Sequence, residues 1–200
     1  MSRRSADERR EELIEAAIRV MIRDGVAKAT TRAVVAEAGL PLGAFHYCFR
    51  SKEELLQSVI ERIMVRALAP AVAAGVPGRP VDEVVHTTLH AYWDRIRRSP
   101  DEHMLTYELT QFALRRPELA ELARRQYQHY LDVTRSSLEA IADLAGIEWA
   151  LPLPVLARYG LGVLDGLTLT WLIDRDDAPA LDALDAYAAH LVSLARTPGT

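Results

Sequence analysis

Two short helical segments separated by a glycine turn constrain this chain more than any other feature. Apolar spacing and helix-end signals predict helices at about residues 32–38 and 42–48, with Gly39 between them. Two helices joined by so tight a turn form a helix-turn-helix, in which the first helix braces against the DNA backbone and the second lies in the major groove. Phe45 and Phe49, four residues apart, give the second helix an inner face. The segment from about residue 30 to 48 is therefore predicted to bind DNA.

The rest of the chain has helical periodicity and no strand signal. The first helix ends at Gly25, and a Ser51–Glu54 capping box, in which Glu54 reaches back to the Ser51 amide, starts a long helix to about Ala69. Further helices are predicted at about 81–98, 101–115, 118–145, 154–174 and 179–196. The predicted fold is all-α, with an N-terminal three-helix DNA-binding domain containing the helix-turn-helix at residues 8–55 and a larger helical domain at 56–200.

Charge is distributed unevenly along the chain. The net charge is −4, and residues 1–55 contribute about +1 to it while the remainder contributes −5. This asymmetry favours a nucleic-acid-binding end, the alternative being two ordinary solvated surfaces.

Cys48 is the only cysteine, which excludes an intrachain disulfide and fits a reducing, cytoplasmic setting. The charged first twelve residues lack a signal-peptide pattern, and the apolar segment at 151–173 contains Arg158 and Asp165, so we expect a buried helix there and no membrane association.

Spaced residues around the helix-turn-helix match a known pattern. They are the helix-capping Thr30, the Ala38-Gly39 turn, Gly43, the aromatic Phe49 and the Ser51-Lys52-Glu53 start of the next helix. In these positions the chain resembles the TetR/AcrR family of repressors, strongly from near Leu13 to about Leu55 and beyond residue 60 only in length and helical plan. The resemblance implies a cytoplasmic homodimer that represses transcription at a palindromic operator of double-stranded DNA and is released by a small-molecule effector.

The resemblance also assigns DNA contacts residue by residue. Thr30 and Thr31, at a helix N-terminus, are expected to present donors to a phosphate, and Lys52 is expected to contact another. The groove contacts are expected from the second helix. These are Leu42 and Ala44, which suit thymine methyl groups, and His46 and Tyr47, which suit bases or phosphates.

Three residues of this segment depart from the family's pattern. Pro41 replaces a capping serine or threonine, His46 replaces a tyrosine, and Cys48 replaces an aromatic residue or histidine. Proline suits a helix start, so the fold is retained. The departures leave open whether Tyr47 supplies the usual tyrosine–phosphate contact or packs with His46 on the next helix. They motivate an alternative function, a helical small-molecule-binding protein without operator binding.

The middle helices are expected to enclose the effector pocket. Aromatic surface with a few polar groups suits a small, largely apolar ligand. The expected lining residues are Trp93, Met104, Tyr107, Glu108, Gln111, Phe112, Tyr127 and Asp165. The alternative for each of these side chains is a place in an ordinary core.

The last two helices are implied by the resemblance to form a four-helix bundle with those of a second copy. The expected dimer residues lie on two helical stripes. They are Gly160, Leu164, Leu167 and Trp171 on one helix, and Leu184, Tyr187, Leu191 and Leu194 on the other. The alternative is that both stripes face only the core of one protomer.

Catalytic, metal and cofactor motifs are not convincing. His86 and His90 have metal-ligand spacing, but no third ligand is evident in the sequence, so no metal site is predicted. The glycines of residues 160–166 lack the preceding strand and the exact spacing of a dinucleotide loop, and no cofactor is expected. Because neither a nucleophile elbow nor a Walker loop is present, we do not expect an enzyme; an all-helical enzyme stays as a third class.

Overall fold

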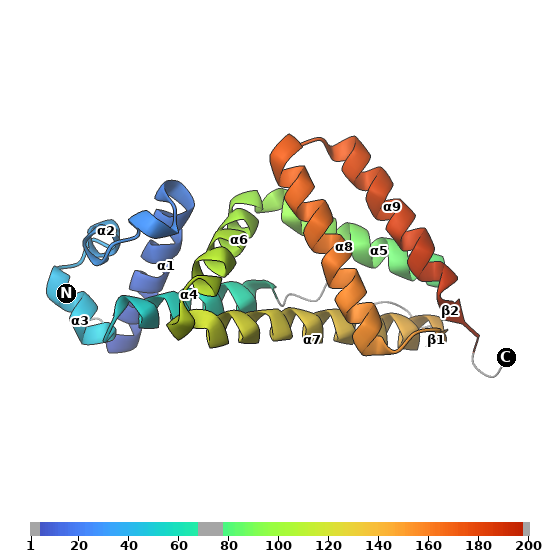
Figure 1. The fold of residues 1–200 in the computed structure, drawn as a ribbon, viewed down its shortest axis with the longest axis horizontal. Coiled ribbons are helices and arrows are strands. Elements are labelled where there is room, and N and C mark those ends of the chain that lie inside the picture. Colours follow the sequence, from blue (N-terminus) through green and yellow to red (C-terminus); the bar gives the residue numbers. More distant parts are fainter. Residues whose placement is uncertain (1–4, 68–77, 198–200) are drawn as a thin grey trace. The chain divides into compact units, whose positions relative to one another are not determined.

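The computed structural model describes residues 5–67 and 78–197, and Figure 1 labels their elements. The helices are α1 (Ala6–Asp24), α2 (Thr31–Glu37), α3 (Leu42–Cys48), α4 (Lys52–Ala67), α5 (Val81–Arg98), α6 (Pro100–Leu114), α7 (Ala120–Ala145), α8 (Leu153–Asp174) and α9 (Asp177–Ser193). Short 3₁₀ turns at Val26–Lys28 and Pro117–Leu119 precede α2 and α7. The all-α prediction is confirmed, and the predicted helix ends agree with the observed ones to within a few residues, except for the end predicted near Ala69, which lies outside the described residues.

The first compact unit joins residues up to 67 with residues 101–126. Helix α1 starts at a capping box formed by Ser5 and Glu8, and it ends at Gly25, whose φ is 88°. Leu13 and Met21 of α1 are buried in one core with Leu105 and Leu109 of α6. Helix α6 therefore helps to form the core that supports the helix-turn-helix, so this unit is larger than the predicted DNA-binding domain of residues 8–55, whose boundary stays a prediction.

The second compact unit contains residues 78–100 and 127–197. Helix α9 packs against α5 and α8, and fully buried Trp93 of α5 meets Trp171 of α8 edge to face, with ring centroids 5.7 Å apart. Two short strands, β1 (Glu148–Trp149) and β2 (Ala195–Arg196), pair antiparallel. The sequence did not predict them because two residues are too few to make an alternating pattern.

Within residues 5–67 and 78–197, no helix is long and apolar enough to cross a bilayer.

Candidate nucleic-acid interface

The turn between α2 and α3 depends on one cap and one glycine. The Thr30 hydroxyl oxygen accepts a hydrogen bond from the Ala33 N–H at 3.2 Å, which fixes the start of α2. Gly39 has a φ of 65°, in the left-handed region that glycine adopts without strain. Helix α3 then begins after Pro41, which makes no side-chain capping bond. The predicted helix-turn-helix is therefore present, with Thr30 capping as expected.

Helix α3 has one buried face and one exposed face. Phe45 and Phe49 are buried with their ring centroids 5.6 Å apart, as the sequence spacing predicted. Ala44 is only 8% exposed, and its predicted contact with a thymine methyl group stays a prediction. On the other face Tyr47 is 70% exposed, and Leu42 and His46 are also exposed. The exposed face of α3 therefore carries Leu42, His46 and Tyr47, and Ala44 is buried with the two phenylalanines.

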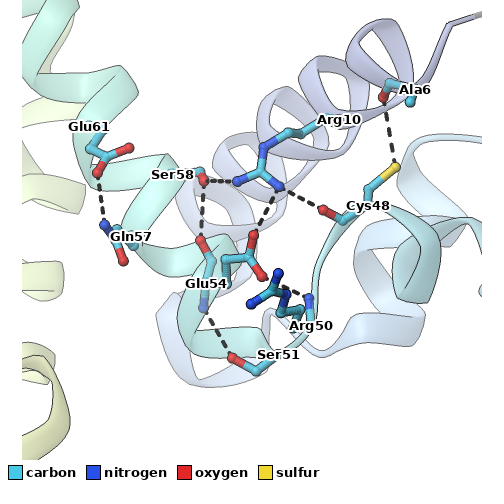
Figure 2. A network of polar contacts seen from close by, with 9 residues as sticks. All are labelled: Ala6, Arg10, Cys48, Arg50, Ser51, Glu54, Gln57, Ser58 and Glu61. Atoms are coloured by element: carbon cyan, nitrogen blue, oxygen red, sulfur yellow. Dashed lines mark hydrogen bonds and ion pairs between the residues drawn. The ribbon is translucent and has the colours of Figure 1, made fainter.

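Arg10 of α1 joins α3 to α4, a role that sequence reasoning missed. Its guanidinium donates to the Cys48 carbonyl at 2.6 Å, to Glu54 Oε1 at 3.1 Å and to Ser58 Oγ at 3.0 Å (Figure 2). The same guanidinium lies over the Phe49 ring, 4.2 Å from its centroid. One planar group thus holds the C-terminal end of α3, a geometry that arginine permits and lysine does not.

The start of α4 differs from the predicted capping box by one residue. The Ser51 hydroxyl accepts from the Glu54 N–H at 3.2 Å, as expected. Glu54 Oε2, however, accepts from the Arg50 N–H at 2.8 Å, so the prediction that it reaches the Ser51 amide is wrong. Its other oxygen is held by Arg10. These bonds from Arg50 and Arg10 lower the pKa of Glu54, which keeps the carboxylate charged.

Two basic side chains lie near each other at the first turn of α4. Lys52 is half-buried, and burial together with the positive charge of Arg116 lowers the pKa of its ammonium group. The Arg116 guanidinium stacks on the Phe112 ring, 3.4 Å from its centroid, which limits where it can move. Like charges held together favour a bound anion. Arg116 follows α6 in sequence, so no local motif pointed to it.

Ion pairs also attach α2 to α1. Glu37 accepts from Arg23 at 2.8 Å and from Arg19 at 2.9 Å. These two bonds lower the pKa of Glu37, the one from Arg23 having the larger effect. The bracing helix is therefore tied to α1 near its C-terminal end.

The predicted effector residues fall in both compact units. Met104, Tyr107, Glu108, Gln111 and Phe112 belong to the first unit, and Trp93, Tyr127 and Asp165 to the second. Glu108 accepts a hydrogen bond from the Val26 N–H at 2.7 Å, which uses its carboxylate to fix the segment after α1. The pocket itself stays a prediction.

In the second unit a carboxylate lies among tyrosines. The Tyr127 hydroxyl donates to Asp165 Oδ2 at 3.2 Å, and Tyr127 meets Tyr130 edge to face. Burial, with a further contribution from the Asp165 charge, raises the pKa of both Tyr92 and Tyr127 to about 12. Both phenols therefore stay protonated at neutral pH, and Asp165 is the anionic group of this cluster.

A shallow polar cleft of about 530 Å³ opens elsewhere in the second unit. Its lining is Asp94, Arg97, Arg98, Trp171, Arg175 and Asp177. Arg97 is paired with Asp177 at 2.6 Å, and Arg175 stacks over Trp171 at 4.8 Å. The Arg97–Asp177 ion pair offsets one positive and one negative charge of this lining.

The predicted dimer stripes are largely occupied within the protomer. Five of their residues are buried there, namely Gly160, Trp171, Leu184, Tyr187 and Leu191. Leu164, Leu167 and Leu194 are half-buried. A side chain at Gly160 would meet the Tyr187 hydroxyl at 2.7 Å, so the glycine serves α8–α9 packing.

A different stripe of α8 faces outward. Its members repeat alternately every four and three residues, which is the spacing of a helix–helix seam. They are Val155, Tyr159, Gly162, Gly166, Leu169 and Ile173, all of them exposed. Ile173 reaches 78% exposure, the highest among the large apolar residues of the described chain. An apolar stripe of this kind is typical of a surface that another helix covers.

Comparison with known proteins agrees with this geometry. The model of bacterial regulatory proteins of the tetR family matches residues 13–59, and the model of the C-terminal part of BetI-type transcriptional repressors matches residues 80–196. The nicotine-responsive transcriptional repressor HdnoR of Paenarthrobacter nicotinovorans is 30% identical over 90% of this chain and 92% of its own.

Solved structures have the same fold. The multidrug binding protein EbrR, solved with imidazole, is 27% identical, with a TM-score of 0.65 over 96% of this chain and 93% of its own. A transcriptional regulator from Rhodococcus sp. Rha1 is 23% identical, with a TM-score of 0.70 over 93% of this chain and 97% of its own. Both parts of the chain thus match one family, which consists of regulators and not of enzymes. The chain belongs to the TetR family of DNA-binding transcriptional regulators.

Proposed function

We propose that the protein is a dimeric repressor that binds a palindromic operator and leaves it when a small organic effector binds. The observation that carries this proposal is the pair of exposed faces on α3 and α8, one suited to a DNA groove and the other to a second copy. Its site of action would be the cytoplasm, where bacterial operators lie.

The DNA contacts of the proposal follow from exposure and charge. Leu42, His46 and Tyr47 would face the groove, and the Arg9 guanidinium lies over the Tyr47 ring, 6.0 Å from its centroid. Thr30 and Thr31 at the start of α2 would bind one phosphate. Lys52, with Arg116 close to it, would bind another, because an anion relieves the repulsion between the two cations.

The outward stripe of α8 would form the centre of the dimer. Gly162 and Gly166 stand at its middle and let two helix backbones approach closely, while Val155 and Ile173 supply apolar surface at its ends. Such a symmetric contact brings two copies of α3 to the two halves of a palindrome. The buried stripes that the sequence favoured would instead hold each protomer together.

Substitution of Tyr47 and Lys52 tests the DNA interface. We expect Lys52→Met to weaken binding to all DNA sequences and to lower the slope of log K against log salt by about 0.9, because one phosphate contact is lost. Tyr47→Ala should weaken operator binding by about 10-fold or more, since an exposed contact of α3 disappears. Both are measured by gel shift on DNA selected from a random pool.

Arg124→Met is the charge-matched control, because Arg124 is exposed in the same unit and pairs only locally with Glu121. If the wild-type protein selected no palindromic DNA that it binds in a salt-dependent way, the proposal would be contradicted. If it bound small molecules all the same, the alternative of a helical small-molecule-binding protein without operator binding would hold.

The effector would be a small, largely apolar molecule with a basic nitrogen. Asp165 supplies an anion beside the rings of Tyr127 and Tyr130, and aromatic faces with a carboxylate suit an organic cation. Trp93 is fully buried, and its indole N–H has no acceptor among the described residues, so it is a further donor for such a ligand. The relative HdnoR responds to nicotine, a molecule of this chemical class.

Replacement of the carboxylate tests this effector class. With nicotine as the probe, we expect tryptophan fluorescence to report binding to the wild-type protein and Asp165→Asn to weaken it by about 10-fold, because a charge-assisted contact is lost. Asp182→Asn, which removes an exposed acid of α9, should bind like the wild type. Equal binding to wild type and Asp165→Asn would contradict the role of Asp165, and failure of all basic probes to bind would contradict the effector class.

A further inference from the structure

Three metal-ligating side chains converge where α5 packs against α9. His86 and His90 lie one turn apart on α5, and Asp185 of α9 faces both of them. Asp185 Oδ1 is 3.3 Å from His86 Nε2 and 2.7 Å from His90 Nε2. The sequence contained only the histidine pair, and the third group comes from a helix 95 residues away. We propose that His86, His90 and Asp185 bind a divalent transition-metal ion of the zinc class.

The spacing of the three ligand atoms suits such an ion. Metal–ligand bonds of about 2.0–2.1 Å in a tetrahedral site keep neighbouring ligand atoms about 3.3 Å apart. The three ligand atoms already lie within 4.8 Å of one another. The two imidazole rings stack with centroids 3.9 Å apart and an interplanar angle of 18°, which directs both Nε2 atoms to the same side. Small rotations of the side chains therefore suffice to surround an ion.

The ligand set also selects the kind of ion. Two imidazoles with one carboxylate match zinc, cobalt, nickel and copper, whereas magnesium and calcium prefer oxygen ligands alone. His86 and Asp185 are about half exposed, so the site is reached from solvent and water can fill the remaining coordination positions. The ion would link α5 to α9 within the second unit, and this inference is independent of the effector and operator proposals.

The test is metal binding by the untagged, chelator-treated full chain. Zinc at a free concentration 100-fold above its Kd should raise the Tm by about 5–10 °C, because the ion binds only the folded site. Bound cobalt should give visible d–d absorption bands that disappear when zinc displaces the cobalt. Magnesium should not change the Tm. His90→Asn and Asp185→Asn should each abolish the zinc-induced rise in Tm. His190→Asn, which removes another histidine of α9 that contacts Tyr159 instead, should retain it.

The comparison uses the zinc-induced change in Tm for each variant, because loss of the hydrogen bond between His90 and Asp185 alone can lower the Tm without metal. A zinc-induced rise that survives in both His90→Asn and Asp185→Asn would place the ion elsewhere and overturn the proposal. If calorimetry at about 1 mM metal detected neither zinc nor cobalt binding to the wild type, the proposal would also be overturned, and the hydrogen bond between His90 and Asp185 would remain.

Discussion

The double variant Leu169→Asp/Ile173→Asp should behave as a monomer and lose most of its affinity for the operator. Both side chains are exposed in the protomer, at 46% and 78%, so the fold tolerates the change. In the proposed dimer the four added carboxylates would be buried or pressed together along the α8 seam, which strongly disfavours association. A monomer binds one half-site without the gain from a linked second contact, so we expect operator affinity to fall by about 10²–10⁴-fold.

The measurements are sedimentation equilibrium for the oligomeric state and gel shift for the operator. The matched control is Thr87→Asp/Ala91→Asp, which adds the same charge to exposed positions of α5 in the same unit but away from the seam. This control should remain dimeric and bind the operator. If the α8 variant stayed a dimer, the interface would lie on another face, and the assignment of the outward stripe would be wrong.

The contrast between α3 and α8 explains how far the sequence could predict the site. At α3, Phe45 and Phe49 are aromatic, four residues apart and both buried, so their spacing identified the inner face correctly. Helix α8 has apolar residues around most of its circumference, including buried Leu156 and exposed Leu169. A period of 3.6 residues then fits more than one stripe, and only the packing of α9 separates the inner stripe from the outer one.

Contacts between residues distant in sequence were beyond prediction for a different reason. Arg10 and Glu54 are 44 residues apart, Val26 and Glu108 are 82 apart, and His90 and Asp185 are 95 apart. Taken alone, Arg10, Glu108 and Asp185 have the character of ordinary solvated charges. Local patterns gave the helices and their caps, whereas the partners of these charges depend on which helices pack together.

Arg10→Met should weaken operator binding, although Arg10 is a positioning residue and does not contact DNA itself. The change removes the donors to the Cys48 carbonyl, Glu54 and Ser58, and the ring contact with Phe49. The C-terminal end of α3 would then keep the packing of Phe45 and Phe49 and the contact of the Cys48 thiol with the Ala6 carbonyl. We expect a Tm lower by about 4–8 °C and an operator affinity lower by about 10-fold, since a loosened helix must be ordered again on binding.

The salt dependence of binding separates positioning from direct contact. A phosphate contact at Arg10 would lower the slope of log K against log salt by about 0.9 on substitution, and Arg10→Lys would restore it because lysine also binds phosphate. A positioning role leaves the slope unchanged, and lysine does not restore affinity because its ammonium cannot make the same divergent set of bonds. Arg124→Met is again the control for loss of one positive charge. Wild-type affinity and Tm in Arg10→Met would contradict the positioning role of Arg10.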